Sequence, residues 1–166
     1  GEYFTFEEYK DKVKDLQTDK DGKLVMLYAA HKDGQHSFIK RADDKGYDVL
    51  LMDSPIVSHL MQKLETSNEN LTFARVDSDS IDKLIKKEDD QPSKLSEEQI
   101  NNLKPIIEGN VDKAKFTVMM ENLSSDESPF MITVPEFMRR MKEMSMTGGG
   151  MMGMGNMPDM YNLVVN

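Results

Sequence analysis

Three short runs of consecutive apolar residues mark the first half of the chain. They are LVMLYAA at 24–30, YDVLLM at 47–52 and LTFARV at 71–76, and each has the length of a buried strand. Helical patterns precede the first run and stand between the others. Because parallel strands need crossover connections, this order predicts βαβ units, with a parallel three-stranded sheet covered by helices on both faces.

Local signals predict where the helices of this half begin and end. Thr5 and Glu8 have the spacing of a capping box, and Gly46 fits the position after a helix over 36–45. Ser54 and Pro55 fit the N-cap and first turn of the next helix. On the first helix we expect an inward face made of Phe6, Tyr9 and Val13. On the third helix the apolar residues that share a face are Ile56, Leu60 and Leu64.

The pattern changes after a polar segment, KKEDDQPSKL at 86–95, which predicts a domain boundary. We therefore expect one domain over 1–90 and another over 91–166. Ser96 and Gln99 predict the start of a helix that Pro105 either kinks or restarts, and its apolar positions are Ile100, Leu103, Ile106 and Ile107.

Strand patterns follow this helix. Alternation at Ala114, Phe116 and Val118 predicts a half-buried strand, with 130–133 returning as its partner and 161–165 as a further strand. The predicted fold class is α/β: a small αβα three-layer subdomain with a parallel sheet, then an α+β domain truncated at its end.

Nine of the fifteen methionines lie between Phe137 and Met160. Phe137, Met141 and Met144 are spaced i, i+4 and i+7, with Met138 beside them, which predicts an amphipathic helix. Thr133 and Glu136 have capping-box spacing, Pro135 fits the first turn, and Gly148–Gly150 ends the helix.

Two interpretations of this helix remain open. Methionine is unbranched and polarizable, so a methionine-rich face adapts to many partners, which is typical of promiscuous binding surfaces. The alternative is that the stripe packs into the domain's own core. Residues 148–155 hold five glycines and three methionines, which favours a mobile loop beside the helix.

Composition excludes several classes of function. A net charge of -9 without a basic stripe argues against nucleic acid as a partner, and no apolar run is long enough to span a membrane. No export signal and no cysteine are present, so we expect a cytoplasmic protein without thiolate chemistry. Because the first residue is Gly, we expect the functional protein to be longer.

Candidate catalytic and metal-binding residues are few. Asp19, Asp21 and Gly22 resemble part of a calcium loop but fit a plain turn better, and Asp77 and Asp79 fit a helix cap better than a metal site. The histidines match no metalloprotease spacing. We therefore expect no catalysis and no resident metal in this segment. One alternative function remains, binding of Cu(I) or a small ligand by the thioethers of Met144, Met146, Met151, Met152, Met154 and Met157.

With these elements placed, the sequence resembles the bacterial heat-shock protein 90 family, HtpG, and within it the proteins of the Bacteroides group. The blocks that carry the resemblance are YFTFEEYKDKVK, GYDVLLMDSPIVSHLMQKLE, FARVDSDSID and PFMITVPEFMRRMKEM, and the likeness covers essentially the whole chain. It implies the small αβα end of the family's middle domain over 1–90, then the front of its C-terminal dimerisation domain, without the terminal helices.

The resemblance also implies a function. The family is an ATP-dependent chaperone of the stress response that binds unfolded or partly folded clients, and its site for ATP and Mg²⁺ lies upstream of this segment. Client-contacting positions of the family align with Phe137, Met138, Met141 and Met144, and a second patch aligns with Ser58, His59 and Gln62. The family's homodimer uses helices beyond this segment, so we expect the chain to be monomeric or weakly associated.

Overall fold

The computed structural model describes residues 3–54, 56–88, 94–125, 127–147 and 159–166, with no account of the side chains at 144–147. The chain divides into two compact units, each with its own β-sheet. The first comprises Gly1–Asp77 and Ile81–Glu88, and the second comprises Ser78–Ser80 and Asp89–Asn166. No helix in the described ranges has the length and apolar content needed to cross a membrane.

The sheet of the first unit is parallel and three-stranded, as the apolar runs predict. Its strands are β1 (Leu24–Ala29), β2 (Val49–Leu51) and β3 (Leu71–Arg75), in the order β2-β1-β3. Residues Leu27 and Val49 are opposite each other in one pair of strands, and Leu24 and Leu71 in the other. The central strand β1 is buried along almost its whole length, which explains its unbroken apolar sequence.

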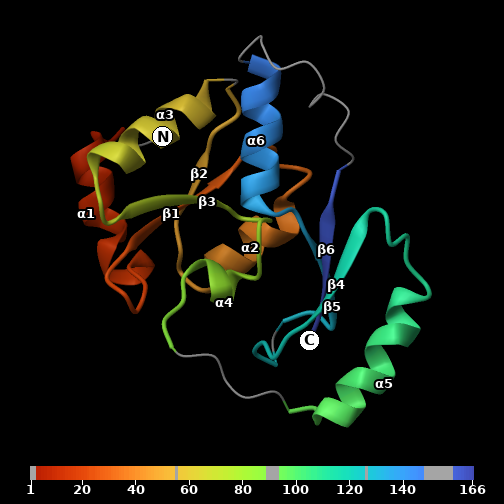
Figure 1. The fold of residues 1–166 in the computed structure, drawn as a ribbon. Helices are drawn as coiled ribbons and strands as arrows, with labels where there is room; N and C mark the ends of the chain where they lie inside the picture. Colours follow the sequence, from red (N-terminus) through yellow and green to blue (C-terminus); the bar gives the residue numbers. More distant parts are fainter. Residues whose placement is uncertain (1–2, 55, 89–93, 126, 148–158) are drawn as a thin grey trace. The chain divides into compact units, whose positions relative to one another are not determined.

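Four helices cover the two faces of this sheet, giving the αβα arrangement (Figure 1). Helices α1 (Phe6–Gln17) and α3 (Val57–Ser67) pack on one face, and α2 (His36–Asp44) and α4 (Ile81–Leu84) on the other. Alternate β1 side chains divide between two cores. Met26 and Tyr28 join the core beneath α1 and α3, whereas Val25, Leu27 and Ala29 join the core beneath α2 and α4.

The capping box predicted for α1 is present. The Thr5 side chain accepts from the backbone of Glu8, and the Glu8 carboxylate accepts from the backbone N–H of Thr5 at 2.7 Å. This backbone hydrogen bond, with a second from the Thr5 hydroxyl, holds the pKa of Glu8 below its usual value. Gly46 has φ of +77° after the end of α2, a conformation that favours glycine there.

Helix α3 differs from its prediction in its start and in its buried face. It begins at Val57 after an N-cap at Ile56 that makes no side-chain cap bond, so Ser54 does not cap it. The face against the sheet carries Val57, Met61 and Leu64, with Met61 fully buried. The sequence offers two overlapping stripes at helical spacing, and the stripe containing the flexible Met61 fills the core.

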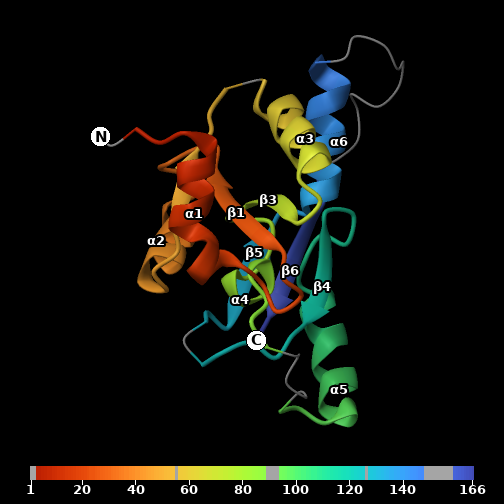
Figure 2. The same ribbon diagram turned by 90° about the vertical axis from the view of Figure 1, so that its left-hand side faces the viewer.

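The second unit contains two long helices and a mixed sheet. Its helices are α5 (Glu97–Glu108) and α6 (Glu136–Thr147), and its strands are β4 (Phe116–Met120), β5 (Phe130–Thr133) and β6 (Tyr161–Val165). The predicted pairing of 130–133 with the preceding strand is wrong, because β6 lies between β4 and β5 (Figure 2). β6 runs parallel to β4 and antiparallel to β5. The apolar β6 buries Val164 and Val165, so the central position suits it best.

Helix α5 begins as predicted, with Ser96 and Gln99 forming a capping box. Pro105 lies inside the helix, which continues to Glu108. None of the α5 side chains is buried, although its apolar positions repeat at helical spacing.

The capping box predicted for α6 is not formed. Thr133 is the last residue of β5 and is fully buried, and its hydroxyl has no hydrogen-bond partner among the described residues. Glu136 instead bonds to arginines of its own helix. The backbone N–H of Arg139 donates to the carbonyl of Pro135, so Pro135 stands at the helix start.

Candidate client-binding surface

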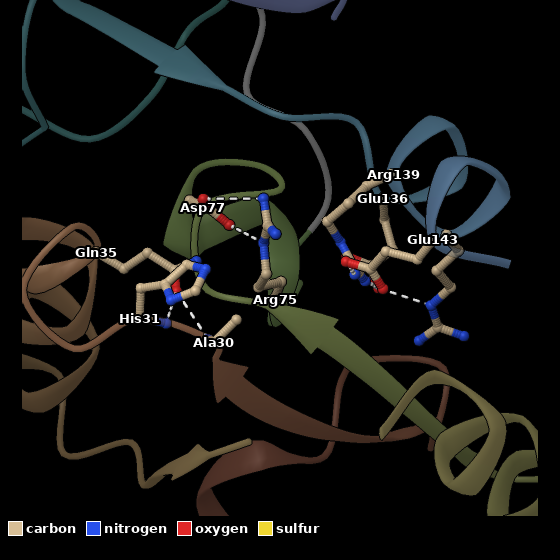
Figure 3. A network of polar contacts seen from close by, with 9 residues as sticks. Ala30, His31, Gln35, Arg75, Asp77, Glu136, Arg139 and Glu143 are labelled. Atoms are coloured by element: carbon tan, nitrogen blue, oxygen red, sulfur yellow. Dashed lines mark hydrogen bonds and ion pairs between the residues drawn. The ribbon is translucent and has the colours of Figure 1, made fainter. Parts of the chain in front are cut away.

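One face of α6 is held together by ion pairs at helical spacing. Arg139 donates to Glu136 at 2.6 Å and to Glu143 at 2.5 Å (Figure 3). Arg140 donates through Nε to Glu136 at 2.7 Å. Residues three and four apart on a helix are neighbours, so these four side chains form one charged face. Both arginines therefore make ion pairs within their own helix.

The other face of α6 carries the apolar candidate residues. Phe137, Met138 and Met141 project away from the charged face, because each is offset from it by roughly a quarter to a half of a helical turn. Phe137 is 70% exposed, and Met138 and Met141 are half-buried. Burying a phenylalanine side chain stabilises a folded protein by about 1.5–3 kcal/mol, and the exposed Phe137 does not provide this stabilisation.

These exposures bear on the choice between a binding face and a core face. Phe137 is not a core residue, and Met138 and Met141 are accessible in part. Met144 lies on α6, but its side chain is outside the described residues. The face therefore consists of one exposed aromatic ring with two half-accessible thioethers beside it, a composition that fits adaptable apolar contacts.

The second group of candidate residues lies on α3, in the first unit. His59 and Gln62 are exposed and Ser58 is half-buried, so all three are on the side of α3 turned from the sheet or at its margin. Gln62 accepts a hydrogen bond from the Thr66 hydroxyl through its backbone carbonyl, at 2.8 Å. Its side-chain amide is at the surface.

Two further apolar residues of α3 reach this surface. Ile56 is 68% exposed and Leu60 is 45% exposed, on the same side of the helix as His59. Sequence spacing alone groups them with Leu64 and gives no sign that they leave the core. The face of α3 beside His59 is thus more apolar than the three aligned positions suggest.

A long-range ion pair ties α6 to the chain that follows it. Lys142 pairs with Asp159, two residues before β6, at 2.5 Å. Both side chains are substantially exposed, so the pair contributes little to stability.

The acidic residues that were weighed as metal ligands are engaged in local structure. Asp77 forms an ion pair with Arg75 at 2.5 Å, and Asp79 accepts from the backbone N–H of Ser80 (Figure 3 shows the first of these). Asp19 accepts from Asp21 and Lys23 in a turn that also contains Gly22. The described residues contain no group of three or more His, Asp or Glu side chains placed to hold a metal ion.

None of the thioethers proposed as Cu(I) ligands can be placed on this surface. Met151, Met152, Met154 and Met157 lie outside the described residues, as do the side chains of Met144 and Met146. The copper alternative therefore stays a prediction.

Comparison with known proteins identifies relatives along the whole chain, although no family model matches it. The chaperone protein HtpG of Bacteroides thetaiotaomicron is 46% identical over 169 aligned residues, which cover 100% of this chain and 25% of the relative. HtpG of Porphyromonas gingivalis is 44% identical and that of Bacteroides fragilis 46% identical, with the same coverage.

The chain spans about a quarter of the length of these curated relatives. The likeness extends through both units, including α3 and α6. A sequence that aligns from end to end at this identity belongs to the HtpG family of chaperones, over a segment of those longer proteins.

Proposed function

We propose that this segment binds exposed apolar stretches of unfolded or partly folded client proteins, as part of a molecular chaperone. The observation that carries the proposal is the apolar face of α6, where Phe137 is 70% exposed beside the half-buried Met138 and Met141. The family membership of the chain supports it independently.

The chemistry of this face suits a binder of many sequences. A ring and flexible thioethers present apolar area without fixed hydrogen-bonding geometry, so they accept aliphatic and aromatic client side chains alike. The ion pairs of Arg139 with Glu136 and Glu143 keep the charged groups on the opposite face. Client binding would therefore cover the apolar face without desolvating those charges.

We assign α3 a second contact with clients, through His59 and Gln62 at the surface and Ser58 at its margin. Ile56 and Leu60 extend this patch with exposed apolar area. Once a client chain has bound to one patch, the other patch meets further segments of the same chain at a raised effective concentration.

The proposal extends to the longer protein. Residues 1–90 would be the end of a middle domain and residues 91–166 the front of a C-terminal domain. An ATPase site with Mg²⁺ would lie upstream and the homodimer contact downstream, in a cytoplasmic chaperone. No residue of this segment is assigned to ATP.

The test compares one site variant with one matched variant on another helix. Phe137→Asp removes the exposed ring from α6, and Ile106→Asp makes the same change at a 63% exposed position of α5. Binding of a reduced, carboxymethylated and hence permanently unfolded protein is followed by fluorescence anisotropy, and the midpoint of thermal unfolding is measured for each variant.

We expect Phe137→Asp to weaken client binding about tenfold or more while stability changes by less than about 1 kcal/mol, as at surface positions. Ile106→Asp should leave binding close to that of the unaltered chain. Equal losses from both variants would mean that α6 is not the anchor. A loss of about 3 kcal/mol of stability in Phe137→Asp would place the ring in a core.

A further inference from the structure

The outer edge of β2 is open for pairing with another strand. β2 is at the end of the order β2-β1-β3, and the backbone N–H of Met52 donates to Ala29 of β1 at 2.8 Å. Because backbone groups alternate along a strand, the N–H groups of Val49 and Leu51 point away from β1. An unpaired edge of this kind is a template for an added strand.

At the opposite edge of the same sheet, one outward backbone group is occupied by a side chain. There the backbone N–H of Phe73 donates to the carboxylate of Glu65 at 2.7 Å, so a side chain of α3 occupies an outward group of β3. Among the described residues no side chain bonds in the same way to Val49 or Leu51. Leu51 is 58% exposed.

A hollow of about 560 Å³ lies beside this open edge, within the size range of ligand sites. Ile39 of α2, Tyr47 and Val49 supply apolar lining, and Lys32 and His36 line the part near the start of α2. Val49 belongs both to the hollow and to the edge strand. Side chains of a strand added to β2 would therefore extend over the hollow at alternate positions.

The two ends of the hollow differ in the charge of the residues that line them. Lys40 is paired with Asp44 and Asp48 with Lys12, so these groups are satisfied within the unit. Asp43, in the last turn of α2, adds a negative charge at the end of the hollow away from Lys32. Lys32 and His36 have no ion-pair partner among the described residues. Because α2 begins at the carboxyl end of β1, they stand towards the Leu51 end of β2, where the positive end of the α2 dipole adds to the charge of Lys32 and His36 offers a ring N–H.

We propose that the β2 edge binds an extended polypeptide segment with apolar and acidic side chains. The segment pairs with the backbone of Val49 and Leu51, lays an apolar side chain on Ile39 and Tyr47, and directs a carboxylate to Lys32 and His36. With only two outward residues, the edge alone binds weakly, so the hollow must supply much of the affinity and the selectivity. The inference rests on the proposed function only in taking unfolded polypeptide as the ligand class.

The probe is a fluorescent synthetic peptide of seven residues, alternating valine and threonine and ending in two glutamates. Its control replaces the glutamates with lysines. Amide hydrogen exchange measured by NMR on the unaltered chain should slow at Val49 and Leu51 when the acidic peptide is added. The lysine peptide should bind at least about threefold more weakly, the range expected for exposed charge pairs.

Matched variants separate the charge from the backbone contribution. Lys32→Glu with His36→Glu should weaken the acidic peptide about three- to tenfold, whereas Lys113→Glu, an exposed lysine of the second unit, should change it less than about twofold. Leu51→Pro removes an outward N–H without breaking the bond to β1 and should weaken binding about tenfold, unlike Leu51→Val. Circular dichroism and thermal midpoints establish that each variant folds.

The outcomes discriminate between the two proposals. If Phe137→Asp leaves peptide binding intact, the β2 edge is a separate site, as we infer. If the unaltered chain shows no protection at Val49 and Leu51 while clients still bind α6, the edge inference fails and the proposed function stands. Sedimentation showing a dimer that Leu51→Pro abolishes would assign the edge to a second copy and overturn the peptide.

Discussion

The side chain of Gln17 accepts a hydrogen bond from the backbone N–H of Asp48, with 2.7 Å between Oε1 and N. The same amide group donates to the carbonyl of Val25 at 2.9 Å, and Gln17 is almost fully buried. One side chain at the end of α1 thus satisfies backbone groups of β1 and of the residue before β2. Local amphipathicity does not predict such a link, because Gln17 is polar at a core position.

We expect Gln17→Leu to lower the free energy of unfolding by about 2 kcal/mol or more. The substitution leaves the half-buried N–H of Asp48 and the buried carbonyl of Val25 without partners, and a buried unpaired group costs about 1–3 kcal/mol. Chemical denaturation checks this, with Gln62→Leu on the exposed side of α3 as the control. Equal stability of the two variants would mean that the buried amide contributes nothing beyond its volume.

The first unit could be predicted from sequence because its signals agree with one another. Unbroken apolar runs require strands buried on both faces, helical patterns between them require crossovers, and Gly46 supplies a helix end. The parallel sheet follows from these constraints together. What spacing does not decide is the rotation of α3, since the stripes through Leu60 and Met61 both have helical spacing.

The second unit was harder to predict for a different reason. Neighbouring strands in sequence are expected to pair, but β6 separates β4 from β5 after a long excursion through α6. Local pattern cannot report such non-local order. The prediction of a Thr133 cap was wrong for a related reason. The Thr133 side chain is fully buried in the second unit and does not cap α6. The exposure of Phe137 could not be predicted either, because periodicity shows which residues share a helix face but not whether another element covers that face.

The rotation of α3 gives a second prediction from adjacent residues. Met61→Ala should cost about 2–5 kcal/mol, because a fully buried side chain leaves a cavity in the core beneath α1 and α3. Leu60→Ala should change stability by less than about 1 kcal/mol, because that side chain is 45% exposed. Thermal and chemical denaturation distinguish them. A larger loss of stability for Leu60→Ala than for Met61→Ala would mean that the predicted face of Ile56, Leu60 and Leu64 packs against the sheet.

The third prediction concerns alkaline pH. Burial raises the pKa of Tyr9, and the nearby charge of Asp48 raises it further. The unfolded state therefore loses the tyrosine proton first, near its ordinary pKa of about 10, and stability falls as pH rises above that value. Below that pH the full contribution is present.

Tyr9→Phe should reduce this alkaline loss. The buried hydroxyl of Tyr9 has no hydrogen-bond partner among the described residues, so removing it should leave stability at neutral pH within about 1 kcal/mol or slightly higher. Tyr3→Phe, at a 98% exposed position, should leave the pH profile unchanged. Unfolding free energies at pH 8 to 11 check both; parallel profiles for Tyr9→Phe and the unaltered chain would contradict the cause we assign.

The last prediction separates the two proposed binding surfaces by their response to salt. At α6 the contact is apolar and the charges of Glu136, Arg139 and Glu143 are already paired, so client binding should change little when salt is raised. It should also show a negative heat-capacity change, the mark of buried apolar area. At the β2 edge, the charge of Lys32 attracts the acidic peptide, and binding there should weaken as salt screens the attraction. Calorimetry at about 50 and 500 mM salt measures both, the higher value shortening the screening length to well below 10 Å. Strong salt dependence at α6 would mean that its arginines, rather than Phe137 and its neighbours, hold the client.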